Sequence, residues 1–160
     1  MKRFFSLFLT LSLIFCIATA IPSEATTTDN QTISIVEQLE NGDYIKTVIH
    51  YDTTPTSEGT PMRSTITGTK TSSYLNSNDE VMWEVSVTGT FSYNGSSSSC
   101  TSCSHSATAY GSTWSIKRSG SFKSGNTATA YATATHTILN VSYDHTISID
   151  LSCSANGTLS

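Results

Sequence analysis

The chain has 160 residues, of which 12% are charged, and its formal net charge is −4. So few lysines and arginines offer no basic patch for nucleic acid, and no apolar run beyond the N-terminus is long enough to span a membrane. Serine and threonine dominate, with 28 and 27 residues. Threonine favours strands and serine favours turns, so this composition is typical of an extracellular β-protein.

The N-terminus has the three parts of a secretory signal peptide. Residues 1–3 are basic, residues 4–17 are almost wholly apolar, and residues 18–20 form an A-x-A cleavage signature. The apolar stretch falls short of the roughly 20 residues that a transmembrane helix needs. We therefore predict a signal peptide over residues 1–20, whose removal would leave a secreted chain with a formal net charge of −6, because two basic residues are lost.

A β-hairpin over residues 31–52 is the first element expected after a flexible lead-in at residues 21–30. Asn41-Gly42 lies between its two strands and readily adopts the positive φ angles of a type I′ turn. Residues 53–63 contain two prolines and a glycine, which predict a linker or a long loop. The hairpin can therefore pack separately from a β-sandwich domain that we expect over residues 64–160.

Residues 80–93 carry the clearest strand pattern. Their odd positions are mostly apolar and include Trp83, Val85 and Phe91, whereas their even positions are mostly polar. Since successive side chains of a strand point to opposite faces, this stretch predicts one buried and one polar face. Residues 65–75 form a looser strand before it, and the serine-rich residues 94–104 after it are expected to be a mobile loop.

The remaining strands are read from further alternation. Residues 105–117 look like one strand whose pattern slips at Gly111, as a β-bulge would allow. Residues 121–137 contain the run T-A-T-A-Y-A-T-A-T-H-T, whose alanines share one face that would let an opposing sheet come close. Alanine also favours helices, but the alternation with β-branched threonine favours a strand. Residues 145–153 place Ile147, Ile149 and Leu151 on one face. About seven strands without crossover helices predict an all-β fold, an antiparallel β-sandwich of immunoglobulin-like or jelly-roll-like type.

Three cysteines remain after signal removal, an odd number for an exported protein. Loop entropy favours a disulfide between Cys100 and Cys153, which closes a longer loop than Cys100 with Cys103. Cys103 would then be a free thiol. A weaker alternative is a zinc site made by Cys100, Cys103, His105 and Cys153, although the second Cys-x-x-Cys of a typical site is missing. No cofactor is expected.

Candidate chemistry is sparse. His50 with Asp52, or Asp144 with His145, could form an acid–base pair, but nothing in the sequence completes either site, and no catalytic residue is assigned. Aromatic side chains are better candidates for ligand binding, because sugar rings stack on exposed aromatic faces. The candidates are Tyr93, Tyr110 and Trp114, which flank residues 94–104, and Tyr131 in the middle of the threonine face. Trp114 fits the core better than a ligand site.

Several stretches resemble one group of proteins. They are W-E-V-S-V-T-G-T-F-S-Y-N-G at residues 83–95, Cys100, W-S-I at residues 114–116, and C-S-A-N-G-T-L-S at the end. Together they resemble small secreted proteins of Gram-positive, often gut-dwelling bacteria. That group has no assigned activity, so the resemblance implies bacterial origin, export and a β-sandwich, and it supplies no catalytic residue. Cys103 departs from the pattern.

The sequence therefore favours a non-enzymatic extracellular module that binds a cell-surface glycan or a protein. Two alternatives stay open. One is a small secreted hydrolase that uses either histidine–aspartate pair, and the other is a structural protein whose copies join through an edge strand or Cys103. Nucleic acid is not an expected partner, and no membrane span is expected in the mature chain.

Overall fold

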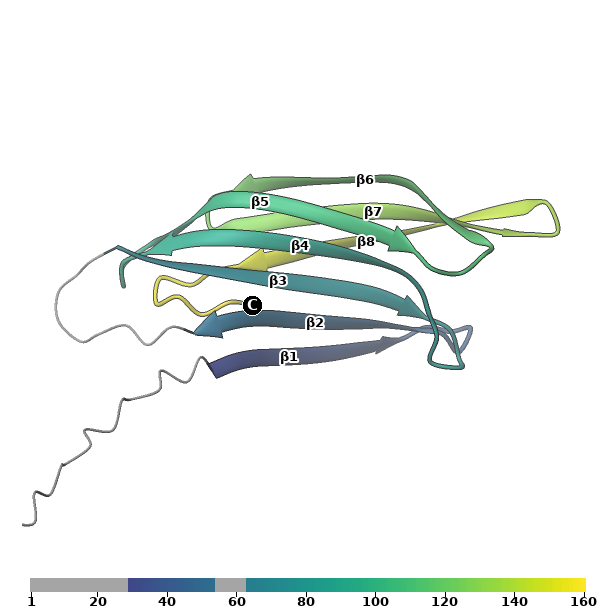
Figure 1. Ribbon diagram of the computed structural model, residues 1–160, viewed down its shortest axis with the longest axis horizontal. Helices are drawn as coiled ribbons and strands as arrows, with labels where there is room; N and C mark the ends of the chain where they lie inside the picture. The colour runs from purple at the N-terminus through teal and green to yellow at the C-terminus, as the bar shows by residue number, and fades with distance from the viewer. Residues whose placement is uncertain (1–28, 54–62) are drawn as a thin grey trace, which may run out of the picture.

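The computed structural model describes residues 29–53 and 63–160, so the predicted signal peptide, the lead-in up to residue 28 and most of the linker lie outside the described residues. The described chain forms eight strands and no helix (Figure 1). The strands are β1 (Asp29–Gln38), β2 (Tyr44–Thr53), β3 (Ser64–Leu75), β4 (Val81–Tyr93), β5 (Ser98–Ala109), β6 (Trp114–Ser124), β7 (Thr127–Ile138) and β8 (Val141–Ser152). This confirms the all-β fold class.

The strands form two antiparallel sheets, one with the order β1-β2-β3-β4-β5 and the other with the order β6-β7-β8 (Figure 1). Within each sheet, strands that are consecutive in sequence pair with one another, so each sheet is a meander rather than the Greek key of immunoglobulin domains and jelly rolls. The predicted hairpin is β1–β2, but its turn is not the expected type I′, because Gly42 has a φ of +87° and Asn41 has no positive φ. Its second strand pairs with β3 from Tyr44↔Leu75 to Tyr51↔Gly68, so the hairpin extends the larger sheet.

Two stretches that the sequence predicts as single strands are each divided between two strands. Residues 105–117 are not one strand with a bulge at Gly111: β5 ends at Ala109, and the chain turns and enters the other sheet as β6. The amides of Tyr110 and Gly111 donate to the Met82 carbonyl, and Trp114 N donates to Gly111 O at 2.9 Å, which closes this turn. A second turn at Gly125, which has φ +56°, separates β6 from β7. The expected loop at residues 94–104 is largely β5.

The core lies where β4 faces β7. Trp83, Val85, Val87 and Phe91 on β4 are fully buried, and so are the alanines of β7 at positions 128, 130, 132 and 134. Small side chains on one sheet let the large ones of the other fit between them. Gly89 adds to this close approach, because a Cβ there would lie 2.6 Å from the Phe91 ring and 3.0 Å from Ala128 Cβ. The predicted inward faces of both strands are therefore confirmed.

The C-terminal residues cover part of the larger sheet that β6–β8 do not reach. Ser152 and Ser160 exchange two backbone hydrogen bonds of 2.9 and 3.0 Å, which holds the end of the chain beside β8. Leu159 is 1% exposed, and its side chain occupies the space above Gly68, next to Tyr51 of β2. This leucine thus belongs to the core although it lies in no strand.

Leu159→Ala should lower the free energy of unfolding by about 2–4 kcal/mol, because it removes a buried side chain and leaves a cavity beside Gly68. Urea denaturation followed by circular dichroism measures the change. Thr158→Ala, at the exposed neighbouring position, is the matched control and should change stability by less than about 0.5 kcal/mol. Equal effects of the two substitutions would show that the C-terminal residues do not pack as described.

Candidate functional site

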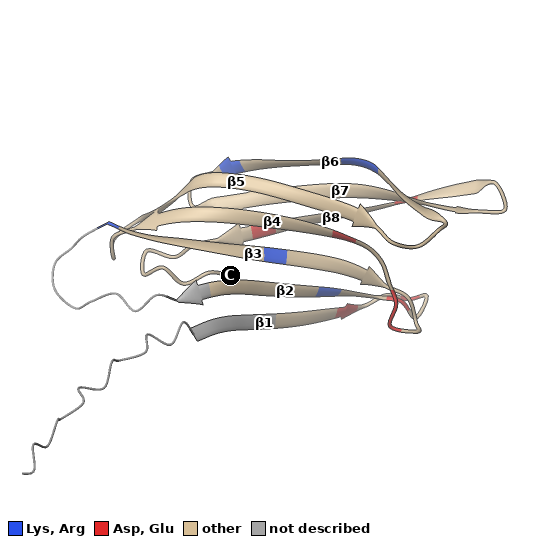
Figure 2. Cartoon of the chain, viewed as in Figure 1, with Lys and Arg blue, Asp and Glu red and all other residues tan. Residues whose placement is uncertain are grey.

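Hydroxyl side chains line the outer face of the larger sheet. They pair across β3 and β4 in regular rungs, with oxygen–oxygen distances of 3.0 Å for Thr67–Thr90, 2.8 Å for Thr69–Thr88 and 2.8 Å for Thr71–Ser86. Charged residues are thinly scattered over the strands (Figure 2). Because these hydroxyls already satisfy one another, residues that depart from the serine and threonine pattern are the better candidates for function.

The clearest departure is an aromatic platform on the outer face of the smaller sheet, formed by Tyr131 and Phe122. Tyr131 is 37% exposed and lies in the middle of β7, directly opposite Gly120 of β6. A Cβ on Gly120 would lie 2.5 Å from the Tyr131 Oη and 2.7 Å from its Cζ, so the ring lies across the glycine. Phe122, 55% exposed, stands opposite Thr129 on the same face.

Polar side chains border the aromatic platform on both sides along the strands. On one side, Arg118 Nε donates to Thr133 Oγ1 at 3.1 Å, and Thr133 pairs with Thr146 at 2.9 Å. On the other side, the Thr129 hydroxyl donates to Asp150 Oδ1 at 2.6 Å. Alternate residues of a strand are about 7 Å apart, so a ring with a free face lies between two rows of hydrogen-bonding groups. Such a surface can hold a ligand that has both an apolar face and polar edges.

The structure does not bring the four predicted ligand residues together. Tyr110 is exposed at the end of β5, and its hydroxyl donates to Glu84 Oε1 at 2.6 Å, a bond that is the main cause of its raised pKa. Trp114 is buried and stacks on His136 with ring centroids 4.2 Å apart, so its place in the core is confirmed. Sequence reasoning missed Phe122 and Gly120, because only the register between β6 and β7 places them beside Tyr131.

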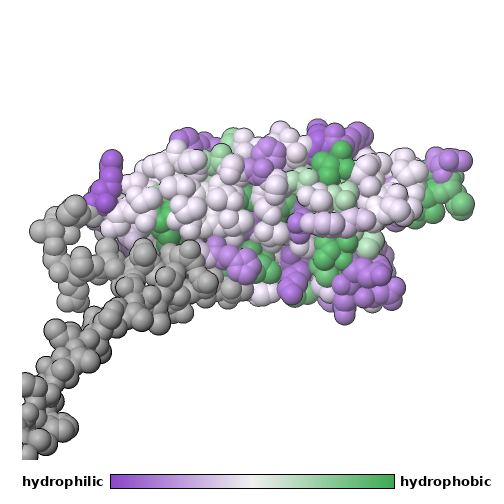
Figure 3. All heavy atoms as spheres, in the orientation of Figure 1, coloured by the Kyte–Doolittle hydropathy of each residue, from purple (hydrophilic) through white to green (hydrophobic). Residues whose placement is uncertain are grey.

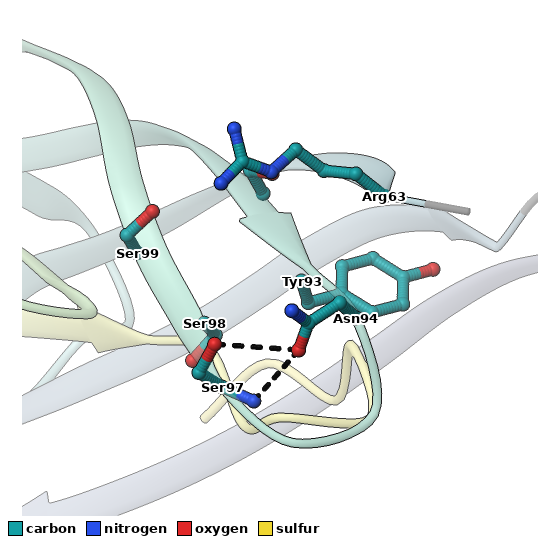
Figure 4. Close-up of a pocket in the computed structure, with 7 residues that line it drawn as sticks. Arg63, Tyr93, Asn94, Ser97, Ser98 and Ser99 are labelled. Carbon is teal, nitrogen blue, oxygen red and sulfur yellow. Dashed lines mark hydrogen bonds between the residues drawn. The ribbon is translucent and has the colours of Figure 1, made fainter. Parts of the chain in front are cut away.

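Tyr93 lines a small polar pocket at the opposite end of the sandwich (Figure 4). The other lining residues are Arg63, Ser92, Asn94 and Ser97 to Ser99. Asn94 Oδ1 accepts hydrogen bonds from the amide of Ser97 at 2.9 Å and from its hydroxyl at 3.3 Å. The Tyr93 ring packs against Gly157, where a Cβ would lie 2.5 Å from the Cζ of the ring. The pocket is thus largely a hydrogen-bonded turn, and it offers less to a ligand than the aromatic platform does.

The candidate acid–base pair of Asp144 and His145 is not assembled, because the two side chains lie on opposite faces of β8. Asp144 lies on the outer face, where it accepts hydrogen bonds from Lys117 Nζ at 2.6 Å and from the Thr135 hydroxyl at 2.7 Å. The adjacent His145 points to the opposite face and lies 5.1 Å from Trp114 between ring centroids. His50 is exposed on β2, and the side chain of Asp52 lies outside the described residues.

All three described cysteines have free thiols, so the predicted disulfide is not formed in this structure. Cys100 and Cys153 are nevertheless neighbours of one turn: Cys100 N donates to Gly125 O at 2.8 Å, and Cys153 N donates to Asn126 O at 3.0 Å. Burial raises the pKa of both thiols, and the charge of Cys100 raises that of Cys153 further.

The zinc alternative gains no support from the described geometry. His105 hydrogen-bonds to Ser121 at 3.0 Å and to Ser119 at 3.3 Å. Among the described residues, no three histidine, cysteine or acidic side chains are placed to hold a metal ion.

No protein-family model, curated protein or solved structure matches this chain. The resemblance to secreted proteins of Gram-positive bacteria therefore stays a prediction. Within residues 29–53 and 63–160 there is no helix with the length and hydropathy to cross a membrane.

His145 should make stability depend on pH. Burial is the main cause that lowers its pKa below 6.5, and His136 lowers it further, whereas Asp43 and Asp144 act in the opposite direction. The unfolded chain therefore binds the proton first, so stability that is fully present above about pH 6.5 decreases as the pH falls and levels off below the folded pKa. We expect thermal denaturation to show a lower Tm at pH 5 than at pH 7.

His145→Gln should reduce this pH dependence, whereas His105→Gln, at an exposed position on β5, should leave it unchanged. An unaltered dependence in His145→Gln would assign the effect to other groups.

Proposed function

We propose that this protein is a secreted, non-enzymatic module that binds a cell-surface glycan through the aromatic platform of β6–β8. The observation that carries the proposal is the position of the Tyr131 ring, which lies across Gly120 on an exposed sheet face. A ring held in this way is ordered before the ligand arrives, so little conformational entropy is lost on binding. Export of the chain is supported by the signal sequence at residues 1–20.

The chemistry of the aromatic platform fits a sugar. The C–H groups of a sugar ring form an apolar face that can stack on Tyr131 or Phe122, while its hydroxyls need both donors and acceptors nearby. Arg118 supplies donors, Asp150 supplies acceptors, and the Thr129 hydroxyl supplies both. Thr133 is buried and holds Arg118 in place rather than facing a ligand.

Binding without hydrolysis is supported by the spacing of the carboxylates. Asp144 and Asp150 are both on the outer face of β8, but six residues of extended strand separate their Cα atoms by about 20 Å. Glycosidases hold their two carboxyl groups about 5 to 10 Å apart. Asp144 is also paired with Lys117, and Asp150 with Thr129, so neither is placed to act as a general acid.

Substitution of Tyr131 tests the proposal. The protein should bind at least one member of a panel of bacterial and host polysaccharides. Tyr131→Ala should lower the affinity for that polysaccharide about tenfold or more in titration calorimetry. Gly120→Ala should also lower this affinity, because the new Cβ displaces the Tyr131 ring while every aromatic residue is kept. Tyr110→Ala removes an exposed tyrosine from the other sheet and is the matched control.

The proposal is overturned if no polysaccharide binds, or if Tyr131→Ala and Tyr110→Ala bind as tightly as the parent chain. Circular dichroism should show the same fold for all three variants, since Tyr131 and Tyr110 are exposed.

We also propose that an oxidising medium pairs Cys100 with Cys153 and leaves Cys103 free. The shared turn at residues 125–126 supports this pairing. A disulfide that closes the loop between Cys100 and Cys153 would stabilise the fold by about 4 kcal/mol. Mass spectrometry of the oxidised protein after alkylation and proteolysis should find one Cys100–Cys153 bridge and one labelled thiol. A Cys100–Cys103 bridge, or three labelled thiols, contradicts the pairing; a dimer linked through Cys103 supports the assembly alternative.

A further inference from the structure

The hairpin that joins β7 to β8 extends past the rest of the smaller sheet and carries an apolar tip. β6 begins at Trp114, which pairs with His136, and the residue before it, Thr113, accepts a 2.9 Å hydrogen bond from Thr137 N. Beyond them the hairpin projects alone (Figure 1), and hydrophobic surface is visible at its end (Figure 3). The tip residues are Ile138, Leu139, Val141 and Tyr143, all exposed, with Leu139 93% exposed.

Leu139 occupies a backbone position at the tip where a leucine does not stabilise the fold. Leu139 and Asn140 have φ angles of +48° and +67°, the left-handed conformations of a two-residue turn. Asparagine and glycine suit these positions, whereas a leucine there is strained. An almost fully exposed side chain makes little contact that could offset the strain. Strained residues of this kind concentrate at functional sites, so the exposed leucine itself needs a role.

Residues along the hairpin are sorted by polarity from the tip to the base. No charged side chain occurs in residues 137–143. The outermost residues are Leu139 and the uncharged Asn140, followed by the aliphatic pair Ile138 and Val141. Tyr143 and His136, which face each other, come next, and the Lys117–Asp144 ion pair of 2.6 Å lies at the base. The Thr137 and Ser142 hydroxyls pair at 3.1 Å, which lowers the cost of removing them from water. Aliphatic end, aromatic belt and charged base are the order in which side chains meet a bilayer surface.

We propose that the tip of the β7–β8 hairpin inserts into the boundary between headgroups and acyl chains of a lipid bilayer and acts as a peripheral anchor. A strand advances about 3.4 Å per residue. Val141 therefore lies within about 5 Å of the end of the hairpin and Asp144 about 13 Å from it. Interfacial segments are buried by about 5 to 10 Å, a depth that covers the aliphatic residues and leaves the ion pair in water.

A soft lipid surface fits the tip better than a second copy of the chain. Stable protein interfaces bury about 800 Å² on each partner and involve about 20 to 30 residues a side. The tip is convex, only two strands wide, and presents four apolar side chains, too few for such an interface. Insertion of four side chains is comparable with the weak, reversible binding of a single acyl chain. The inference does not depend on glycan binding, because the tip and the aromatic platform have no residue in common.

Flotation with phosphatidylcholine vesicles tests the anchor, using the chain after removal of residues 1–20 so that the apolar N-terminal stretch makes no contribution. The protein should float with the vesicles, and about 0.5 M salt should not release it, because the tip carries no charge. Leu139→Gly should lower the partition coefficient about tenfold or more, since it removes the outermost side chain and suits the positive φ. Val36→Thr, at another exposed apolar position, is the matched control and should bind as the parent does.

Ile138→Trp provides an independent readout, because Trp83 and Trp114 are both buried and contribute a constant background. Its emission should shift to shorter wavelength on addition of vesicles and should be quenched by brominated lipid. The proposal is overturned if the protein does not float, if Leu139→Gly floats as well as the parent, or if sedimentation shows a dimer that Leu139→Gly dissociates. The last result would assign the tip to contact between copies of the chain.

Discussion

Close packing of the alanine face of β7 against the large side chains of β4 is the constraint on which the rest of the structure depends. Four methyl groups in a row let the two sheets approach, and Trp83 and Phe91 fill the space that they leave. Since the side-chain period of a strand is two, burying the alanines at positions 128, 130, 132 and 134 of β7 directs the threonines and Tyr131 between them to the outer face. The same logic on β3 and β4 produces hydroxyl-lined outer faces whose side chains satisfy one another.

The candidate functional residues are those that interrupt this alternation of buried apolar and outward hydroxyl side chains. A glycine beneath an aromatic ring occurs on both sides of the sandwich. Gly89 lies under Phe91 in the core, where the ring fills the space between the sheets, and Gly120 lies under Tyr131 on the outer face, where the ring keeps one side exposed. In both places an aromatic ring lies across a glycine. The face of the sheet decides whether that ring contributes to stability or is available to a ligand.

The two proposed surfaces belong to the same three-stranded sheet but depend on different chemistry. The aromatic platform combines rings with hydrogen-bonding rows, as suits a polar ligand with an apolar face. The hairpin tip has aliphatic groups without charges, as suits insertion among lipids. The Lys117–Asp144 pair lies between them and marks where the hairpin becomes polar. A module that touches a membrane through its tip would present the sheet face, which is parallel to the hairpin axis, to polymers near the same surface.

The sequence by itself determined the class of fold and the face on which most residues lie. Alternation is a local property, so residues 80–93 and 127–137 could be assigned to strands and their buried positions named correctly. It did not distinguish a bulge at Gly111 from a turn into another sheet, because both shift the alternation by one residue. Likewise, Tyr131 was a candidate from its place among threonines, but Gly120 and Phe122 were not.

Only the tertiary structure decided which strands share a sheet and which residues form each surface. The place of Phe122 beside Tyr131 depends on the β6–β7 register, and the exposure of Leu139 depends on β6 beginning only at Trp114, opposite His136. Cys100 and Cys153 meet at one turn because strands from both sheets end there. A local pattern with a short turn predicted the β1–β2 hairpin, but the division of the strands between two sheets and the register of β6 against β7 depend on contacts between residues far apart in the chain, which a local pattern does not fix.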